Sequence, residues 1–343
     1  MSFLPQLGPS TRTRPIRDSD GRTVEGSVAT LEPLTLGGVR QWLLVRGRSA
    51  ESPILLKLHG GPGQAEMATV RLNGLLENDF VVAEWDQRGS GKSAAASQPA
   101  TAMNIGQLVA DTIELTEHLT QRFGRRQLIV LGHSWGSVLG LMAVEQRPDL
   151  FSAFVSTGLI ANFADGQQAA YRFVLDESRR RANTKAFTEL NSIGSPPYAG
   201  ADGIEKWRRC ARWLGEFGAV WHSSEKFDRV GWMLASTEYS WPERLRFNRA
   251  AELSFGLLYA DLLAVNLSKT VARVNVPVFF AEGRHDRMAP AEVAERYFTS
   301  LIAPTKELVW FENSAHFPQW EERARFHEFH VKTVLPATAV GSA

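Results

Sequence analysis

Short apolar runs recur near both ends of the chain, and a cluster of glycines or polar residues follows most of them. The runs cover residues 54–58, 80–85, 127–131, 151–157, 278–281 and 308–311. Continuous apolar runs of this length are typical of central strands in a sheet that is covered on both faces. Residues 27–46 hold two further β-rich runs around Leu36-Gly37-Gly38, which predict an antiparallel hairpin with a glycine turn.

Helical spacing fills the intervals between these runs. Apolar residues within 105–123 can line one broad helical face, with Gly124 as the C-cap, and 134–146 predicts a second helix that ends before Pro148. A third helical stretch lies at 291–301. Strands and helices therefore alternate at both ends of the chain, which predicts an α/β fold with a mostly parallel, doubly wound sheet.

The interval 161–273 breaks this alternation. It has helical spacing and no convincing strand, and it is too long to be a plain loop inside a compact domain. We predict a core formed by 1–160 and 274–343, with 161–273 as an inserted helical cap. Five of the ten tryptophans fall in this interval: Trp207, Trp213, Trp221, Trp232 and Trp241. They either form the cap's own small core, or one or two of them line an apolar pocket.

The amino-acid composition argues against several classes of binding partner. Among 343 residues, 38 basic side chains face 37 acidic ones, so the formal net charge of +1 favours neither nucleic acid nor an anionic membrane as a partner. A single cysteine, Cys210, excludes an intramolecular disulfide and a cysteine-based metal cluster, and we expect it to be a packing residue. Residues 1–22 lack the apolar run of a secretory signal, and no stretch approaches the ~18 apolar residues of a membrane span. We expect a soluble, cytoplasmic protein.

The pentapeptide Gly132-His133-Ser134-Trp135-Gly136 matches G-x-S-x-G between a predicted strand and a predicted helix. This context places a serine on a sharp strand-to-helix turn, where the helix N-terminus favours developing negative charge. This setting resembles the nucleophile turn of α/β-hydrolases, so Ser134 is the expected nucleophile.

A serine hydroxyl needs a base, and in this fold the order along the chain is serine, acid, histidine. Asp286 follows the strand predicted at 278–281, and His316 follows the strand predicted at 308–311. Because loops at the carboxyl ends of parallel strands converge, we expect Asp286 to orient His316 and His316 to act as the general base. His285 precedes the acid instead of following it, and Glu282 lies directly against the strand end, so both are weaker alternatives.

Acyl transfer also needs donors for the oxyanion. The backbone N–H of Trp135, next to the nucleophile, is one expected donor, and Gly61 in His59-Gly60-Gly61-Pro62-Gly63 is the other. The segment 86–93 is similar to a phosphate loop only superficially, because Asp86 occupies the position of the first required glycine. We therefore expect a structural turn built on Asp86 and Arg88, and no cofactor.

Together these motifs resemble the proline iminopeptidase (prolyl aminopeptidase) family of α/β-hydrolases. The matching segments are 59–63, 86–93, 132–137, 283–286 and 314–316. The resemblance implies a serine hydrolase that releases an N-terminal proline or other small residue from a peptide or amide through an acyl-enzyme, without a metal. It further implies that cap glutamates hold the substrate's free amino group, and Glu216 and Glu252 are the positions that could do so.

Two alternatives stay open because the predicted cap departs from the usual family pattern. One is an esterase or lactonase with the same triad, which an all-apolar pocket would favour, or an amidase with the same triad that tailors natural products. The other is a noncatalytic hydrolase-like binding protein, against which the intact Ser134, Asp286 and His316 argue. The expected partner is a small peptide, amide or ester. The sequence leaves the oligomeric state open.

Overall fold

A single sheet organises the residues that the computed structural model describes, which are 11–95, 103–223 and 228–339. Its eight strands have the order β1-β2-β4-β3-β5-β6-β7-β8. They are β1 (Val28–Leu36), β2 (Val39–Gly47), β3 (Ile54–Leu58), β4 (Val81–Asp86), β5 (Leu128–His133), β6 (Phe151–Thr157), β7 (Val278–Gly283) and β8 (Lys306–Phe311). Strand β2 pairs antiparallel with β1 on one side and with β4 on the other, and all other pairs are parallel. The predicted hairpin and mostly parallel sheet are confirmed. The first ten residues of the N-terminal segment 1–22 lie outside the described residues.

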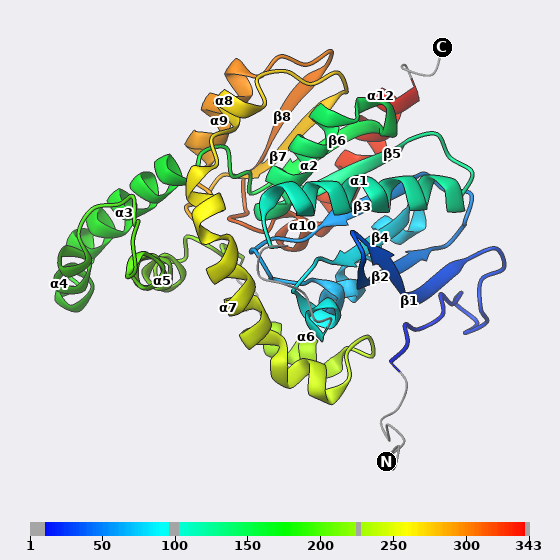
Figure 1. The fold of residues 1–343 in the computed structure, drawn as a ribbon, viewed down its shortest axis with the longest axis horizontal. Coiled ribbons are helices and arrows are strands. Elements are labelled where there is room, and N and C mark those ends of the chain that lie inside the picture. Colours follow the sequence, from blue (N-terminus) through cyan, green and yellow to red (C-terminus); the bar gives the residue numbers. More distant parts are fainter. Residues whose placement is uncertain (1–10, 96–102, 224–227, 340–343) are drawn as a thin grey trace.

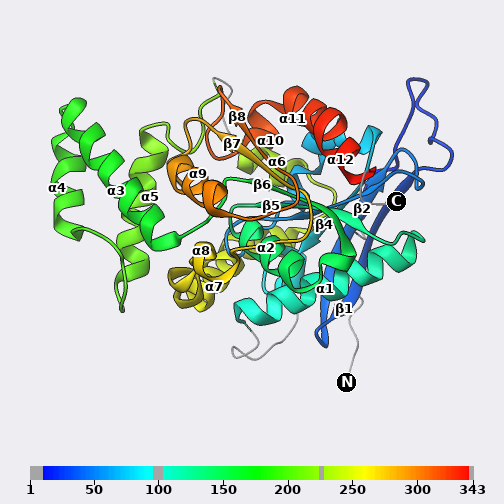
Figure 2. The same ribbon diagram turned by 90° about the horizontal axis from the view of Figure 1, so that it is seen from above.

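Helices cover both faces of the sheet, as Figure 2 shows for α1 and α2 on one side and α11 and α12 on the other. Alternate strand residues point to opposite faces: Leu56 and Val130 join the apolar cluster that contains α1 and α2, whereas Leu55 and Ile129 join the cluster that contains α11. The helices of the sheet layers are α1 (Ile105–Arg122), α2 (Trp135–Gln146), α9 (Ala291–Ser300), α10 (Pro318–Glu321), α11 (Arg323–Phe329) and α12 (Leu335–Ala339). The doubly wound α/β fold is therefore confirmed.

The described residues between β6 and β7 fold into helices. These are α3 (Phe163–Arg180), α4 (Thr184–Ile193), α5 (Gly203–Glu216), α6 (Arg229–Ala235), α7 (Trp241–Ala264) and α8 (Leu267–Thr270). Figure 1 shows α3, α4 and α5 projecting to one side of the sheet, with α7 running between this group and the strands. The division into a core and a cap at 161–273 stays a prediction, and residues 224–227 of this interval lie outside the described residues.

Residues at the end of β4 and in the loop that follows it bind α7 and the segment just before α7. The hydroxyl of Tyr239 donates to the buried Asp86 carboxylate at 2.8 Å, and Lys92 pairs with Glu243 at 2.9 Å. Arg88 is buried and pairs with Asp111 at 2.8 Å. Asp86 and Arg88 thus bind protein groups, in agreement with the structural turn that the sequence predicts. Within the described ranges, no helix combines the length and apolar character required to cross a membrane.

Candidate active site

Ser134 occupies a strained turn between β5 and α2. Its backbone angles are φ 52° and ψ −116°, a conformation that non-glycine residues rarely adopt, and its N–H donates to the carbonyl of Thr157 at 2.9 Å. The flanking glycines permit the close packing of this turn. A Cβ on Gly136 would lie 2.1 Å from the carbonyl oxygen of Leu58, and a Cβ on Gly132 would lie 2.6 Å from that of Gly136. The packing thus explains both glycines of the motif.

His316 and Asp286 form a hydrogen-bonded pair at the carboxyl ends of β7 and β8. The Nδ1 of His316 donates to Oδ2 of Asp286 at 2.7 Å. The other carboxylate oxygen of the buried Asp286 accepts the backbone N–H groups of Met288 at 2.8 Å and Ala289 at 3.0 Å. Burial by itself lowers the pKa of the His316 imidazole, but the Asp286 carboxylate offsets this and leaves that pKa raised. The carboxylate therefore fixes the orientation of the imidazole and favours its protonated form.

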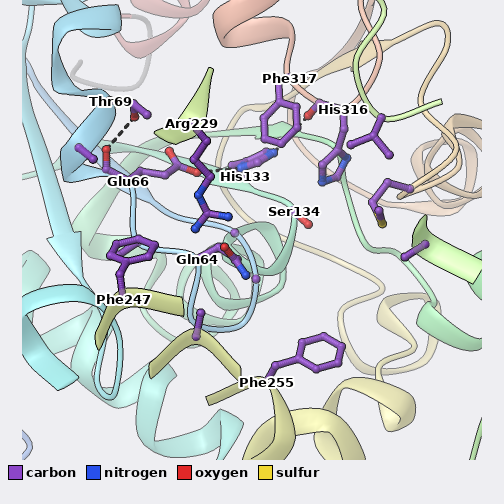
Figure 3. A pocket seen from close by; sticks show the side chains of 18 of the residues that line it. Gln64, Glu66, Thr69, His133, Ser134, Arg229, Phe247, Phe255, His316 and Phe317 are labelled. Carbon is purple, nitrogen blue, oxygen red and sulfur yellow. Dashed lines mark hydrogen bonds and ion pairs between the residues drawn. The ribbon is translucent and has the colours of Figure 1, made fainter. Parts of the chain in front are cut away.

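Ser134 and His316 line one cavity, and Figure 3 shows the serine hydroxyl below the imidazole. Within the described residues the Ser134 hydroxyl makes no hydrogen bond, so its bond to His316 stays a prediction. Such catalytic bonds are often long before substrate binds.

The two rival residues lie outside the lining of this cavity. The ring of His285 stacks on His222, with 3.6 Å between ring centroids, and its Nε2 contacts the carbonyl of Glu312. Glu282 is buried and accepts from the hydroxyl of Ser156 at 3.2 Å. Burial and the nearby Asp286 charge raise the pKa of Glu282 to about 7. The geometry therefore favours His316 and Asp286 as the base and its orienting acid.

The two expected oxyanion donors are Gly61, in the loop after β3, and Trp135, at the start of α2. Gly61 lines the cavity, and a Cβ on its neighbour Gly60 would lie 3.2 Å from the Cβ of Ser134. Trp135 is the first residue of α2, where backbone N–H groups have no acceptor within the helix. Its side chain is buried and donates to Gln87 at 3.2 Å, away from the cavity lining. The oxyanion role of both amides stays a prediction.

The cavity has a volume of about 440 Å³, which suits a small ligand. Most of its side chains are apolar or aromatic: Ala65, Ala68, Trp207, Ala211, Val220, Met233, Phe247, Ala251, Phe255, Met288, Phe317 and Trp320. Of the five tryptophans in the interval 161–273, Trp207 is in this lining, whereas Trp213 is buried and Trp241 is 61% exposed. The buried Cys210 packs in the main apolar cluster, as the sequence predicts.

Sequence reasoning missed a polar pair on the wall of the cavity. The Nδ1 of His133 lies 2.9 Å from a carboxylate oxygen of Glu66, and the Nε2 of His133 lies 3.1 Å from the carbonyl of His316. Burial opposes ionisation of Glu66, but His133 and Lys57 lower the pKa of this carboxyl to about 2. A neutral imidazole can donate to only one of these two acceptors, and burial lowers the pKa of His133. The available signal was the position of His133 beside the nucleophile.

The structure separates the two glutamates that were expected to bind an amino group. Glu252, on α7, is exposed and lines the cavity. Glu216, at the end of α5, is not in the lining; its carboxylate is exposed and lies 3.9 Å from Arg212. The position of Glu216 therefore gives no support to its expected role, because a solvated carboxylate outside the cavity cannot hold a substrate there. Sequence reasoning also missed Arg229 and Gln64, which line the cavity.

No group of three or more His, Cys, Asp and Glu side chains in the described parts of the chain has an arrangement that could hold a metal ion.

Comparison with known proteins places this geometry in a family. A family model described as alpha/beta hydrolase fold matches residues 53–323. The chain belongs to this family. The hydrolase is 34% identical over 303 residues to the probable aminopeptidase YbaC of Bacillus subtilis (strain 168), and the match covers 88% of this chain and 94% of that protein.

The resemblance to proline iminopeptidases is also confirmed. This α/β-hydrolase is 26% identical over 283 residues to the proline iminopeptidase of Clostridium botulinum, a match that covers 81% of this chain and 88% of the relative. The crystal structure of a proline iminopeptidase from Mycobacterium smegmatis matches with a TM-score of 0.62 at 17% identity, and the match covers 91% of this chain and 100% of that one. At this identity, the structural likeness shows a shared fold.

Proposed function

We propose that this hydrolase uses Ser134, His316 and Asp286 to release an N-terminal proline or other small residue from a short peptide or amide. The observation that carries the proposal is the 2.7 Å bond between His316 and Asp286, next to a strained Ser134 in the same cavity. The same set of a nucleophile, a base and an acid that orients the base performs acyl transfer on several unrelated folds, in different orders along the chain.

In the proposed reaction the hydroxyl oxygen of Ser134 attacks the substrate carbonyl carbon while Nε2 of His316 takes the hydroxyl proton. The amides of Gly61 and Trp135 donate to the resulting oxyanion. The C–N bond then breaks, and His316 gives its proton to the leaving amine. His316 next takes a proton from water, whose oxygen attacks the carbonyl carbon of the acyl-enzyme. The bond between that carbon and the Ser134 oxygen then breaks, His316 returns its proton to the Ser134 oxygen, and the carboxylic acid leaves.

Glu252 is the remaining candidate for binding the substrate's ammonium group. It lines the cavity from α7, and within the described residues it forms no ion pair or hydrogen bond. A free carboxylate there can pair with a cationic N-terminus. The names of the relatives, aminopeptidase and proline iminopeptidase, support the same substrate class.

The test is hydrolysis of prolyl and alanyl anilides, each with a free and with an acetylated amino group. Ser134→Ala is the blank and should lower turnover by ~10⁴-fold or more without unfolding the protein. Turnover confined to free-amine substrates supports the aminopeptidase. Near-wild-type turnover in Ser134→Ala would refute the proposed nucleophile. His316→Ala should be comparably damaging and His285→Ala mild, and the reverse ranking would mean that His285 is the base.

An esterase is the second candidate, because most of the cavity lining is apolar. It would use the same triad and would not need Glu252. Preferential cleavage of acetylated amides or simple esters in the same assay would favour this candidate over the aminopeptidase.

A further inference from the structure

Arg229 is a positive charge in the cavity that the proposed mechanism does not use. It is the first residue of α6, and Figure 3 shows its side chain extending into the cavity between Glu66, His133 and Phe247, with the guanidinium above Gln64. The guanidinium lies over the ring of Phe247, 5.1 Å from its centroid. An arginine in a mainly apolar cavity carries its charge at all ordinary pH values and favours an anionic partner.

The guanidinium of Arg229 has no anionic partner within hydrogen-bonding distance among the described residues. Within the described residues Arg229 forms no hydrogen bond and no ion pair. Glu66 attracts it through space, but that carboxylate is already bound by His133 at 2.9 Å and lies 3.8 Å from Lys57. The guanidinium therefore keeps its donors for a ligand, and its planar fork matches a carboxylate in a bidentate pair.

A second polar group on the same wall is also unsatisfied. The side-chain oxygen of Gln64 is buried and has no hydrogen-bond partner. Since buried polar groups are nearly always paired, an unpaired acceptor in a cavity lining indicates a ligand that donates to it. The N–H groups of a peptide are donors of this kind.

Opposite charges thus line one cavity without neutralising each other. Glu252 on α7 and Arg229 on α6 form no ion pair, although both line the cavity that holds Ser134. A free dipeptide carries an ammonium group at one end and a carboxylate at the other, and the cavity of about 440 Å³ suits its size. We propose that Arg229 binds the free C-terminal carboxylate of a short zwitterionic peptide, whose cleavage by Ser134 rests on the proposed function.

Binding to the Ser134→Ala protein tests this inference without turnover. The probes are prolyl-alanine and its C-terminal amide, which differ only in the carboxylate, and calorimetry gives the Kd of each. We expect the acid to bind about 10- to 100-fold more tightly than the amide, the range for a charge-assisted hydrogen bond. Adding Arg229→Met should remove this preference, and Arg229→Lys should retain part of it.

Arg246→Met is the matched control, because Arg246 is an exposed arginine of α7 outside the cavity lining. It removes the same charge from the molecule and should keep the preference for the acid. Equal binding of acid and amide, or a preference that survives Arg229→Met, would overturn the inference.

Turnover by the wild-type protein distinguishes failure of the carboxylate site from failure of the proposed function. If the protein cleaves prolyl-alanine but binds acid and amide equally, the peptidase stands and the carboxylate site is refuted. If it binds the acid through Arg229 but cleaves neither peptide, the carboxylate site stands and the peptidase is refuted.

Discussion

Gly158 lies against the imidazole of His316, the base of the proposed mechanism. It follows β6 with φ +59°, and a Cβ at this position would lie 2.7 Å from both Cε1 and Nδ1 of His316. The imidazole cannot retreat freely, because Asp286 holds its Nδ1 at 2.7 Å and the ring of Phe317 packs against it with 5.1 Å between centroids. Gly158→Ala should therefore displace the imidazole from its present position, where it shares the cavity with Ser134.

The expected loss of activity follows from this displacement. A shift of the ring by a few tenths of an ångström to 1 Å relieves the overlap, and a misplacement of about 1 Å lowers rates by ~100-fold. The left-handed backbone adds about 1–2 kcal/mol of destabilisation, which the melting temperature reports. We expect kcat/KM for the alanyl anilide to fall by ~100-fold while the protein stays folded.

Gly200→Ala is the control that separates the effect of the steric overlap with His316 from the effect of the backbone strain. Gly200 has φ +85°, and no atom lies within 4 Å of a Cβ built there. This variant should lose a similar amount of stability and keep wild-type kcat/KM. If Gly158→Ala also keeps wild-type kcat/KM, the ring of His316 is not confined as the structure implies.

Three further predictions concern the charges around the site. Asp286→Asn should lower kcat/KM by ~10⁴-fold and move the acid limb of the remaining activity to lower pH, because His316 must be neutral to accept a proton and loses the charge that raises its pKa. Glu282→Gln should unfold with less dependence on pH. The native pKa of Glu282, about 7, exceeds its ordinary value of 4.5, so its contribution to stability is present at low pH and lost as the pH rises through 7. Glu66→Gln should lower the free energy of unfolding by about 1–3 kcal/mol and lower kcat more than it raises KM, because Glu66 orients His133 and His133 contacts the carbonyl of His316.

Each of these has a direct readout. The pH profile of kcat/KM tests Asp286→Asn, and an acid limb at unchanged pH would contradict the assignment of that limb to His316. Urea unfolding at pH 5 and pH 8 tests Glu282→Gln, whose stability relative to wild type should rise by up to ~3 kcal/mol between the two. A constant difference would contradict the raised pKa. Wild-type kinetics in Glu66→Gln would show that His133 does not position the base.

The local pattern of apolar and polar residues predicts the strands. It also predicts the order of the proposed triad residues and the closeness of their loops. Apolar runs that end in glycine or polar residues specify buried parallel strands, and the carboxyl ends of parallel strands lie at one edge of a sheet. This rule predicts that the loops of Ser134, Asp286 and His316 lie close together, and in the structure His316 pairs with Asp286 and lines the same cavity as Ser134. The hairpin turn at Gly37-Gly38 is equally local, since both residues adopt positive φ.

The lining of the cavity was decided by tertiary packing. Glu216 and Glu252 look alike in the sequence, since each is a glutamate on a predicted cap helix, but only Glu252 faces the cavity. Arg229 and Glu66 carry no local signature of a site. Whether a charge on a helix is solvated or lies in a cavity depends on how that helix packs, and contacts between residues far apart in the chain set the packing. The sequence by itself determined the fold and led to the proposed triad, because both follow from local pattern, whereas the tertiary structure decided which charges surround the triad.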